Sequence, residues 1–424
     1  LTLIEIQNSQ LQSVNEHIDL VSISCSSLSI NTLTAAQVQE SDLFIAVTQS
    51  PDTNIASAII AKKMGAKQTI ARVHESEFLK TKNSQLFQEL GIDSFIFPQH
   101  LAAQEISNFL KQASSREVFD FADGRLSLFV LKVDDHAPVV GKTLKEAALL
   151  NSSYDYRTVA ITRNSQTIIP KSSDKFSAND LIYVVSNKRG IKKVYEYSGK
   201  KKVDFNNIMI LGGGRTGAMT ASLLENQFNV KLIEMDKQKA TMLADQLFNT
   251  LVIHGDGRST DLLVEEGIRK TDAFIALSGD SETNILSCLL AKRLGVKKTI
   301  AEIENTDYMY LAENMGIDTI INRKFIAASH IYKFTLHAEV STVKHLSQTD
   351  AEMLEFVVHK KSRIANKIIK ESGFPKEATI GGIVRGKEVL IARGDTQIEP
   401  GDKVLVFSLP SVIPIVQSFF EASM

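Results

Sequence analysis

The sequence predicts an α/β protein built from two doubly wound parallel-sheet domains, each followed by a small α+β domain. Three observations carry this prediction. Short apolar segments alternate with amphipathic ones, which is typical of parallel strands covered by helices on both faces. Two long segments of the chain repeat each other at a nearly constant offset. A glycine-rich turn joins one apolar segment to the helical segment that follows it.

The repeat indicates two copies of one domain. The matching segments are Leu1–Gln7 with Val230–Asp236, Asp42–Val73 with Asp272–Ile303, and Leu90–Pro98 with Met315–Arg323. The second copy begins with a further strand and the glycine-rich turn, whereas the sequence opens directly on the strand LTLIEIQ. We therefore expect the first copy to be incomplete at its N-terminus, with residues missing upstream.

Strands and helices can be assigned in order along the second copy. The expected strands are IMIL, VKLIEM, TLVI, AFIAL, TIAEI and TIIN. Amphipathic segments such as Glu282–Gly295 separate them, and this one ends in basic residues followed by glycine, a helix stop signal. SETN after AFIAL, and PDTN at the same place in the first copy, are typical of helix starts. Thr and Asn serve there more often as caps than as ligand contacts.

Two further segments, about Leu126–Tyr195 and Glu352–Phe420, resemble each other more weakly. Each has an initial strand, a β-hairpin pattern (RTVAITRNSQTIIP and ATIGGIVRGKEVLIA), a last apolar strand and a helical tail. They predict two small α+β domains. The polar and basic segment Glu196–Asn207 is the best linker candidate. The expected domains are 1–120, 121–200, 204–335 and 340–424.

The glycine-rich turn has the spacing Gly212-x-Gly214-x-x-Gly217 between a strand and a helix. In a Rossmann-like domain the first glycine permits the tight turn, and the second lets the backbone approach a phosphate. The third allows the helix to pack closely on the strand. The free N–H groups and positive dipole end of the helix N-terminus then favour an anion. The turn predicts a nucleotide site; a glycine turn kept only for packing is the alternative.

An acid follows the turn at the distance expected for a residue that binds a ribose. Glu234 ends the next strand, 234 − 212 = 22 residues after the first glycine, close to the ~20 of dinucleotide-binding domains. An acid here argues for an unphosphorylated ribose, but NAD, ATP and ADP all carry one. A solvated acid at a strand end is the alternative interpretation.

Further candidates follow the next strands, because ligands of doubly wound sheets bind at the carboxyl ends of strands. Gly255 and Asp256 would lie near an adenine, or would form an ordinary Asp-Gly turn. Leu277 and Ser278 end the fourth strand and would form the floor of the crevice.

The first copy departs from this pattern. It keeps an acid, Glu5, at the ribose position, but it has SCSS where the second copy has HGDG. Arg72 stands where the second copy has Glu302. An arginine there could bind a phosphate with two hydrogen bonds, or could form a surface salt bridge. We therefore expect the two sites to differ in affinity or ligand.

Composition excludes several classes of protein. The net charge of −1 gives no general attraction to nucleic acid or to a membrane surface. No apolar run approaches the ~18 residues that span a bilayer. Cys25 and Cys288 have neither metal-site nor disulfide spacing, so a reducing cytoplasm is expected.

These motifs resemble those of the TrkA family, cytoplasmic regulatory subunits of Trk-type bacterial potassium uptake systems. The resemblance covers nearly the whole chain and rests on ILGGGRTGAMTASLLE, VKLIEMD, HGDGRSTDLLVEEGI, TDAFIALSGDSETNILSCLLAKRLG and EPGDKVLVF. Members contain RCK (KTN) domains, each followed by a TrkA-C domain, and RCK domains bind NAD(H) or ATP/ADP. By resemblance, the second site comprises Gly212, Gly213, Gly214, Arg215, Thr216, Glu234, Gly255, Asp256, Leu277 and Ser278, and the first comprises Glu5, Val47, Thr48 and Arg72.

The resemblance also implies an assembly. A tandem chain would form a homotetramer with a ring of eight RCK domains, at the inner face of the cell membrane beneath a K⁺-conducting subunit of the TrkH/TrkG type. Nucleotide binding would shift the ring between conformations and so gate that subunit. Neither a catalytic residue, a metal site nor a nucleic-acid partner is expected.

The main alternative is an NAD-dependent oxidoreductase, which needs a general acid or base near the nicotinamide. His254 lies beside the predicted crevice, but on the adenine side. The small domains offer no Ser/His/Asp or Cys/His constellation. An interaction scaffold with degenerate sites is a third hypothesis, which the intact second glycine turn disfavours. We therefore expect a ligand-regulated protein rather than an enzyme.

Overall fold

The chain forms two compact units, Leu1–His100 and Leu101–Met424. The computed structural model describes residues 1–7, 11, 14, 16, 18–79, 81–111, 117–121, 125–149, 155–164, 166–187, 189–198, 205–335, 340–345 and 349–422. Among the helices in these ranges, none combines the length and the apolar character that crossing a bilayer requires.

The second unit contains a complete Rossmann-like domain. Its strands are β11 (Asn207–Leu211), β12 (Asn229–Glu234), β13 (Thr250–His254), β14 (Ala273–Ala276), β15 (Lys298–Glu302) and β16 (Thr319–Ile321). Its helices are α8 (Arg215–Leu224), α9 (Lys237–Gln246), α10 (Thr260–Glu265), α11 (Ser281–Arg293), α12 (Thr306–Asn314) and α13 (Arg323–Tyr332), with short 3-10 helices η3 (Ile268–Lys270) and η4 (Lys333–Thr335). The parallel strand order β13-β12-β11-β14-β15-β16 is that of a doubly wound sheet. The predicted fold class is confirmed.

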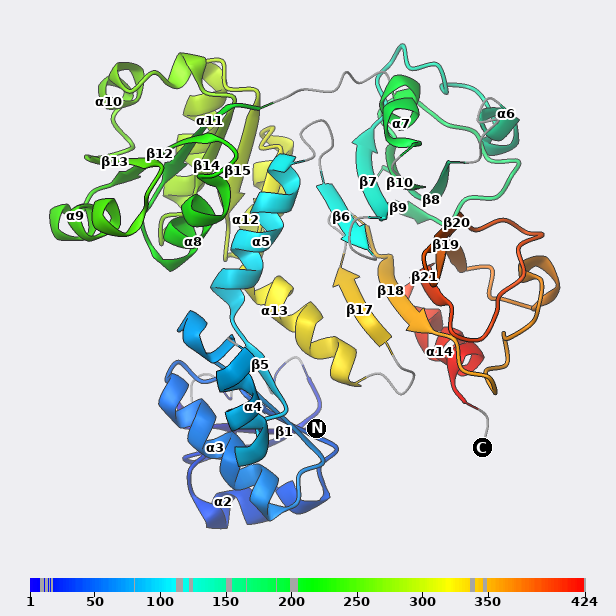
Figure 1. Cartoon of the computed structure of the whole chain (residues 1–424), viewed down its shortest axis with the longest axis horizontal. Helices are drawn as coiled ribbons and strands as arrows, with labels where there is room; N and C mark the ends of the chain where they lie inside the picture. Colours follow the sequence, from blue (N-terminus) through cyan, green and yellow to red (C-terminus); the bar gives the residue numbers. More distant parts are fainter. Residues whose placement is uncertain are drawn as a thin grey trace. The chain divides into compact units, whose positions relative to one another are not determined.

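Helices cover both faces of this sheet (Figure 1). Alternate residues of β11 point to opposite faces, as strand geometry requires. Ile208 and Ile210 are buried in the core that α8 and α9 cover. Met209 is buried in the other core, which α10, α11 and α12 cover. Burial on both faces explains why the strands read as nearly continuous apolar runs.

Part of helix α5 (Pro98–Lys111) packs on the first of these two cores. Ala102, Ile106, Phe109 and Leu110 are buried there together with residues of α8 and β11. The sequence places this segment at the end of the first domain, 1–120. An amphipathic helix displays an apolar stripe but not the identity of the surface that will cover it.

The first unit repeats the Rossmann-like plan without its central strand. Its elements are β1 (Thr2–Glu5), β2 (Val21–Ser24), α2 (Ile30–Ala35), η1 (Val38–Glu40), β3 (Leu43–Ala46), α3 (Pro51–Met64), β4 (Gln68–Arg72), η2 (Ser76–Leu79), α4 (Thr81–Leu90) and β5 (Ser94–Ile96). β1 pairs with β2, and β3, β4 and β5 form a separate parallel sheet. In the second copy β11 pairs with both β12 and β14. Among the described residues of the first copy, β1-β2 and β3-β4-β5 are separate sheets.

The two small domains share one five-stranded antiparallel topology. The first contains β6 (Glu117–Phe121), β7 (Leu126–Lys132), α6 (Leu144–Leu149), β8 (Tyr156–Arg163), β9 (Gln166–Ile168), β10 (Leu181–Asn187) and α7 (Ile191–Ser198). The second contains β17 (Val340–His345), β18 (Glu352–Val357), η5 (Ile369–Glu371), β19 (Ala378–Arg385), β20 (Glu388–Ile391), β21 (Lys403–Ser408), η6 (Pro410–Val412) and α14 (Ile413–Phe420). The orders β6-β7-β10-β8-β9 and β17-β18-β21-β19-β20 are equivalent.

The structure confirms both predicted hairpins, as β8–β9 and β19–β20. It adds edge strands β6 and β17, which precede the two similar segments Leu126–Tyr195 and Glu352–Phe420. The expected linker Glu196–Asn207 is partly structured: Glu196–Ser198 complete α7 and Asn207 begins β11. Residues 199–204 of that segment lie outside the described residues.

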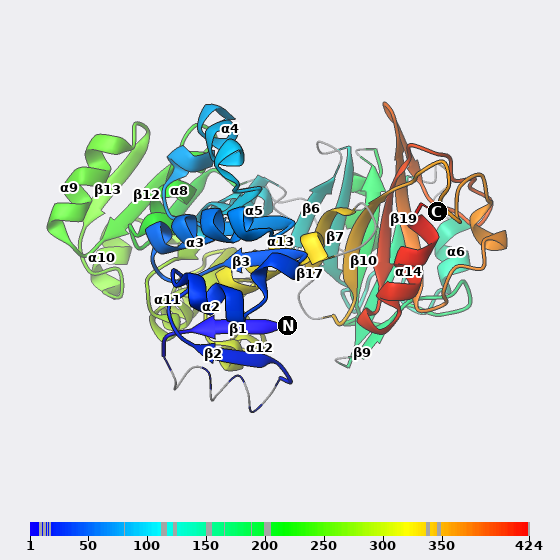
Figure 2. The same ribbon diagram turned by 90° about the horizontal axis from the view of Figure 1, so that it is seen from below.

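The sheets of the two small domains pack against each other, and Figure 2 shows the two domains side by side. Their shared core joins Tyr183 of the first domain to Met353 and Phe407 of the second. Gly381 permits the close approach, because a Cβ at this position would lie 2.9 Å from the side chain of Val185. The pair of small domains is therefore held by apolar contact between strands.

Candidate nucleotide-binding site

The turn between β11 and α8 adopts a conformation that requires glycine at two of its positions. Gly212 has a φ of +101°, and a Cβ there would lie 2.7 Å from the carbonyl oxygen of Leu277. A Cβ on Gly217 would lie 1.9 Å from the carbonyl oxygen of Gly212. Side chains are therefore excluded at both positions. Gly217 thus lies close to the backbone of Gly212, which directly follows β11.

Gly214 differs from these two glycines because the space around it is open. Its φ of −63° and ψ of −179° suit any residue, and no atom lies within 4 Å of where its Cβ would be. It is the N-cap of α8 and offers no side chain to the first helical N–H groups. The N–H groups of Arg215 and Thr216 have no acceptor within the helix. Together they provide a position for an anion at the helix N-terminus.

Glu234 holds the turn from the neighbouring strand. Its Oε2 accepts a hydrogen bond from the N–H of Gly213 at 2.8 Å, and its Oε1 accepts one from the N–H of Asp236 at 2.8 Å. The residue is only 9% exposed. A carboxylate can accept about four hydrogen bonds, so capacity for a ribose hydroxyl remains. The support that Glu234 gives to the turn is a role that the sequence does not reveal.

The candidates beside the adenine position are held by local bonds. His254 pairs with Glu234 across the sheet, and the N–H of Gly255 donates to the carbonyl of Glu234 at 2.9 Å. Asp256 accepts the N–H of Arg258 at 3.0 Å and forms an ion pair with its guanidinium at 2.9 Å. Hydrogen bonds from the Arg258 side chain lower the pKa of Asp256. Asp256 is therefore ionised and shapes the turn before α10.

Ser278 is fixed by Asn284, a residue absent from the predicted site. Oδ1 of Asn284 accepts the N–H and the hydroxyl of Ser278 at 2.9 and 2.7 Å. Its Nδ2 donates to the carbonyls of Ser278 and Glu302 at 3.1 and 2.8 Å. Asn284 thus joins the ends of β14 and β15. The expectation of a cap is wrong, since Asp280 is the N-cap of α11 and accepts the N–H of Thr283.

The first unit repeats this arrangement. Oδ1 of Asn54 accepts the N–H and the hydroxyl of Thr48 at 2.8 and 2.7 Å. Its Nδ2 donates to the carbonyl of Arg72 at 2.9 Å. The recurrence of asparagine at the same place in both copies is the sequence signal that could have identified it.

Other parts of the first site are preserved incompletely. Oε1 of Glu5 accepts the N–H of Gln7 at 3.0 Å, as Glu234 does with Asp236 in the second copy. Val47 is 46% exposed, whereas Leu277 at the same place in the second copy is 4% exposed. Leu277 lies against the glycine turn, since its carbonyl oxygen would be 2.7 Å from a Cβ on Gly212.

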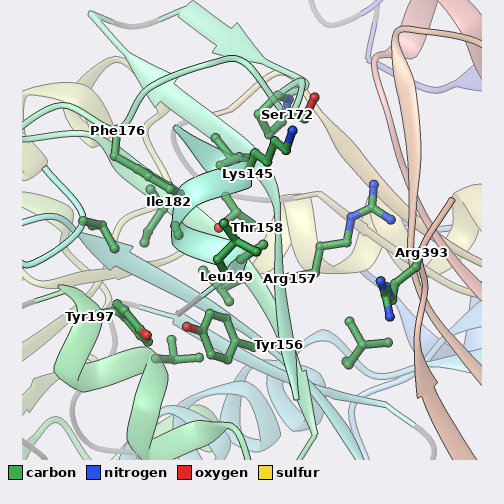
Figure 3. Close-up of a pocket in the computed structure, with 18 of the residues that line it drawn as sticks. Lys145, Leu149, Tyr156, Arg157, Thr158, Ser172, Phe176, Ile182, Tyr197 and Arg393 are labelled. Atoms are coloured by element: carbon green, nitrogen blue, oxygen red, sulfur yellow. The ribbon is translucent and has the colours of Figure 1, made fainter. Parts of the chain in front are cut away.

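A separate cavity of about 450 Å³ lies in the first small domain, and its lining includes Phe176 and Ile182 (Figure 3). Arg157 lines the side that meets the second small domain. Its guanidinium donates to the carbonyls of Ile380 and Ala392 at 3.0 and 2.7 Å. Arg157 therefore belongs both to the cavity lining and to the contact that joins the two small domains.

The fold and the turn define a tandem Rossmann-fold protein in which each Rossmann-like domain precedes a small α+β domain. The TrkA-N domain model matches residues 1–98 and 208–323, and the TrkA-C domain model matches 128–199 and 353–420. The chain belongs to the TrkA family of Trk system potassium uptake proteins, and the resemblance stated from the sequence is confirmed.

Two curated relatives are each named Trk system potassium uptake protein TrkA. That of Haemophilus influenzae is 33% identical, and that of Vibrio alginolyticus is 31% identical. Each comparison covers 100% of this chain and 94% of the relative. A solved structure described as the GsuK channel bound to NAD matches with a TM-score of 0.59 and 16% identity, over 100% of this chain and 74% of that one. At this identity the match shows a shared fold.

Proposed function

We propose that this chain is a regulatory subunit that binds NAD(H) or ATP/ADP and thereby adjusts ion flow through a membrane K⁺-conducting subunit. The observation that carries this proposal is the open position at Gly214. It lies at the N-terminus of α8, beside a turn that Glu234 holds in place. It also lies where the strand order reverses between β11 and β14, which is where doubly wound sheets bind ligands.

Each candidate residue has a role in this proposal. Glu234 would accept the ribose hydroxyls, and the exposed guanidinium of Arg215 would contact the phosphates. The adenine would lie beside Gly255 and Asp256. The remaining residues would form the phosphate turn and the floor of the crevice: Gly212, Gly213, Gly214, Thr216, Gly217, Leu277 and Ser278.

The first unit would contact a ligand through Glu5, Val47, Thr48 and Arg72. Its floor is ordered by Asn54 as in the second copy. SCSS in place of HGDG, and Arg72 in place of Glu302, lead us to expect that the two sites differ in affinity or ligand.

The role of the nucleotide would be regulatory rather than catalytic. Membership of the TrkA family supports the link to potassium uptake, and the fold shared with a channel described as bound to NAD supports the ligand class. We further propose a homotetrameric ring of eight RCK domains at the inner face of the membrane, beneath a TrkH/TrkG-type subunit. A ligand shifts such a ring only if it binds two conformations with different affinity. The exposed His254 lies on the adenine side and gives no support to the oxidoreductase alternative.

The test is calorimetry of the full chain with ATP, ADP, NAD⁺ and NADH, using the variants Gly214→Asp and Gly214→Ala. Both side chains fit the open space, so both variants should fold. Asp also suits an N-cap, but it places a negative charge where the phosphate would lie. We expect Gly214→Asp to abolish binding at the second site and Gly214→Ala to weaken it less.

Reconstitution with a K⁺-conducting subunit then tests the regulatory role. Nucleotide should change K⁺ flux with the wild-type chain and have less effect with Gly214→Asp. Turnover of NAD⁺ or NADH, or binding that Gly214→Asp leaves unchanged, would contradict the proposal.

A further inference from the structure

The last residues of β4 and β15 occupy the same place in the two copies but carry opposite charge. Asn54 donates to the carbonyl of Arg72 at 2.9 Å, and Asn284 donates to the carbonyl of Glu302 at 2.8 Å. At both positions the backbone carbonyl therefore accepts a hydrogen bond from an equivalent asparagine side chain. Only the side chains differ, a guanidinium in the first copy and a carboxylate in the second.

Glu302 lies beside the phosphate position of the second site. Asn284, which orders Ser278 in the floor of the site, also donates to the carbonyl of Glu302. The hydroxyl of Thr216, in the first turn of α8, lowers the pKa of the Glu302 carboxyl. Thr216 follows Gly214 and Arg215, so its amide is one of the helix N–H groups that would receive a phosphate. Glu302 is only 4% exposed, and its Oε2 is buried without a hydrogen-bond partner among the described residues, so the carboxyl is shielded from bulk water.

The charge around Glu302 is only partly balanced. Nε of Arg323 lies 3.2 Å from its Oε1, and the same guanidinium also pairs with Glu304. One cation is thus shared by two carboxylates. Burial raises the pKa of Glu302, and Arg323 opposes that rise. A further negative charge nearby would be repelled strongly, because a buried site screens it poorly.

Nucleotides differ in the charge that they would bring toward Glu302. With the adenine beside β12 and β13, the phosphates would run across the N-terminus of α8 toward β14 and β15. In a dinucleotide both phosphates are esterified at each end and carry one negative charge each. A terminal phosphate carries about −1.5 to −2 at pH 7. ADP and ATP therefore place additional charge on the side where Glu302 lies.

We propose that Glu302 makes the second site selective for dinucleotides over nucleotides that end in a terminal phosphate. This inference rests on the nucleotide site proposed above. The structure assigns this selectivity to a buried carboxyl at the end of β15, joined through Asn284 to Ser278 in the floor of the site. Neutralising Glu302 should then improve ADP and ATP binding without improving NAD⁺ binding.

The experiment measures NAD⁺, ADP and ATP binding to the full chain by calorimetry. Binding at the second site is defined as the part lost in Gly214→Asp. We expect the wild type to prefer NAD⁺ over ADP by about tenfold or more. We expect Glu302→Gln to reduce that preference about tenfold, and to leave the NAD⁺ affinity within about threefold.

Glu304→Gln is the matched control, because Glu304 pairs with the same guanidinium but its side chain is 40% exposed. It should leave the ratio of NAD⁺ to ADP affinity nearly unchanged. Each titration is repeated with Mg²⁺ and with a chelator, since Mg²⁺ neutralises phosphate charge. If ATP binds more tightly than NAD⁺ when Mg²⁺ is present, the assignment is overturned. Glu302 would then act by attracting the Mg²⁺ that accompanies ATP, and not by repelling the terminal phosphate.

The outcomes separate this inference from the proposed function. Absence of binding by all three nucleotides would refute the nucleotide site itself and the selectivity with it. Equal affinities for NAD⁺ and ADP in the wild type would refute only the selectivity. That wild-type comparison stands even if Glu302→Gln fails to fold.

Discussion

The carboxylate of Glu234 accepts the N–H of Gly213 at 2.8 Å, so the acid at the end of β12 fixes the glycine turn at the end of β11. Its second oxygen accepts the N–H of Asp236 at 2.8 Å. One buried side chain therefore orders both the expected phosphate position and the start of α9. Glu234, which the sequence spacing predicts as a ribose-binding residue, thus supports the glycine turn in the structure.

Glu234→Gln should destabilise the second unit. A glutamine amide has one oxygen, so either Gly213 or Asp236 would face an NH₂ donor and lose its acceptor. An unsatisfied buried N–H costs about 1–3 kcal/mol, and we expect a loss of that size in the free energy of unfolding. Chemical denaturation followed by a probe in the second unit measures it. Glu5→Gln is the control, because Glu5 accepts a single N–H at an exposed position; equal losses would contradict the prediction.

Asn284→Ala should destabilise the floor of the second site, and Asn54→Ala should do the same in the first. Each change leaves the N–H of Ser278 or Thr48 without its side-chain acceptor, and the carbonyl of Glu302 or Arg72 without its donor. Both asparagines are almost fully buried, so a loss of about 2–4 kcal/mol is expected for each. Unfolding of each unit, followed separately by hydrogen exchange, tests it. Protection that stays unchanged at β14 and β15 in Asn284→Ala would count against this role.

Arg157→Ala should loosen the contact between the two small domains. The guanidinium donates to two carbonyls and to the hydroxyl of Thr379 at 3.0 Å, all on the second small domain. Hydrogen bonds from a charged donor contribute about 1.5–3 kcal/mol, so faster hydrogen exchange is expected in β19 and β20. Lys145→Ala is the control, since Lys145 lines the same cavity but is exposed. Equal exchange in the two variants would contradict the prediction.

Glu302 should make the stability of the second unit fall as pH rises. Burial raises the pKa of its carboxyl above the unfolded value of about 4.3, so the folded state binds the proton more tightly. The contribution of Glu302 to the free energy of unfolding therefore falls as pH rises from the pKa of the unfolded state to the higher pKa of the folded state. Above both pKa values it no longer changes with pH. Glu302→Gln should flatten this part of the curve and gain stability relative to the wild type there. Urea unfolding between about pH 4 and 8 measures it; parallel curves for the two proteins would rule the effect out.

Much of the fold could be predicted because its signals are local. Alternation of apolar and amphipathic segments reflects burial on both sheet faces, and the repeat identified two copies before any contact was known. Gly212 and Gly217 were identifiable because only glycine can adopt a positive φ readily or approach backbone at 1.9 Å. The hairpins β8–β9 and β19–β20 were likewise visible from strand pattern and turn residues.

The sequence by itself therefore determined the order of strands and helices, the position of the glycine turn and the family. Only the tertiary structure decided that Asn284 joins two strand ends, that Glu302 is buried, and that part of α5 covers the core of the second Rossmann-like domain. It also decided that Gly381 lets one small domain pack on the other. The physical reason is the distance along the chain over which each signal acts. Periodicity and glycine sterics depend on residues that are close in the sequence. Burial of a polar side chain, or the covering of an apolar face, depends on residues that the sequence separates widely.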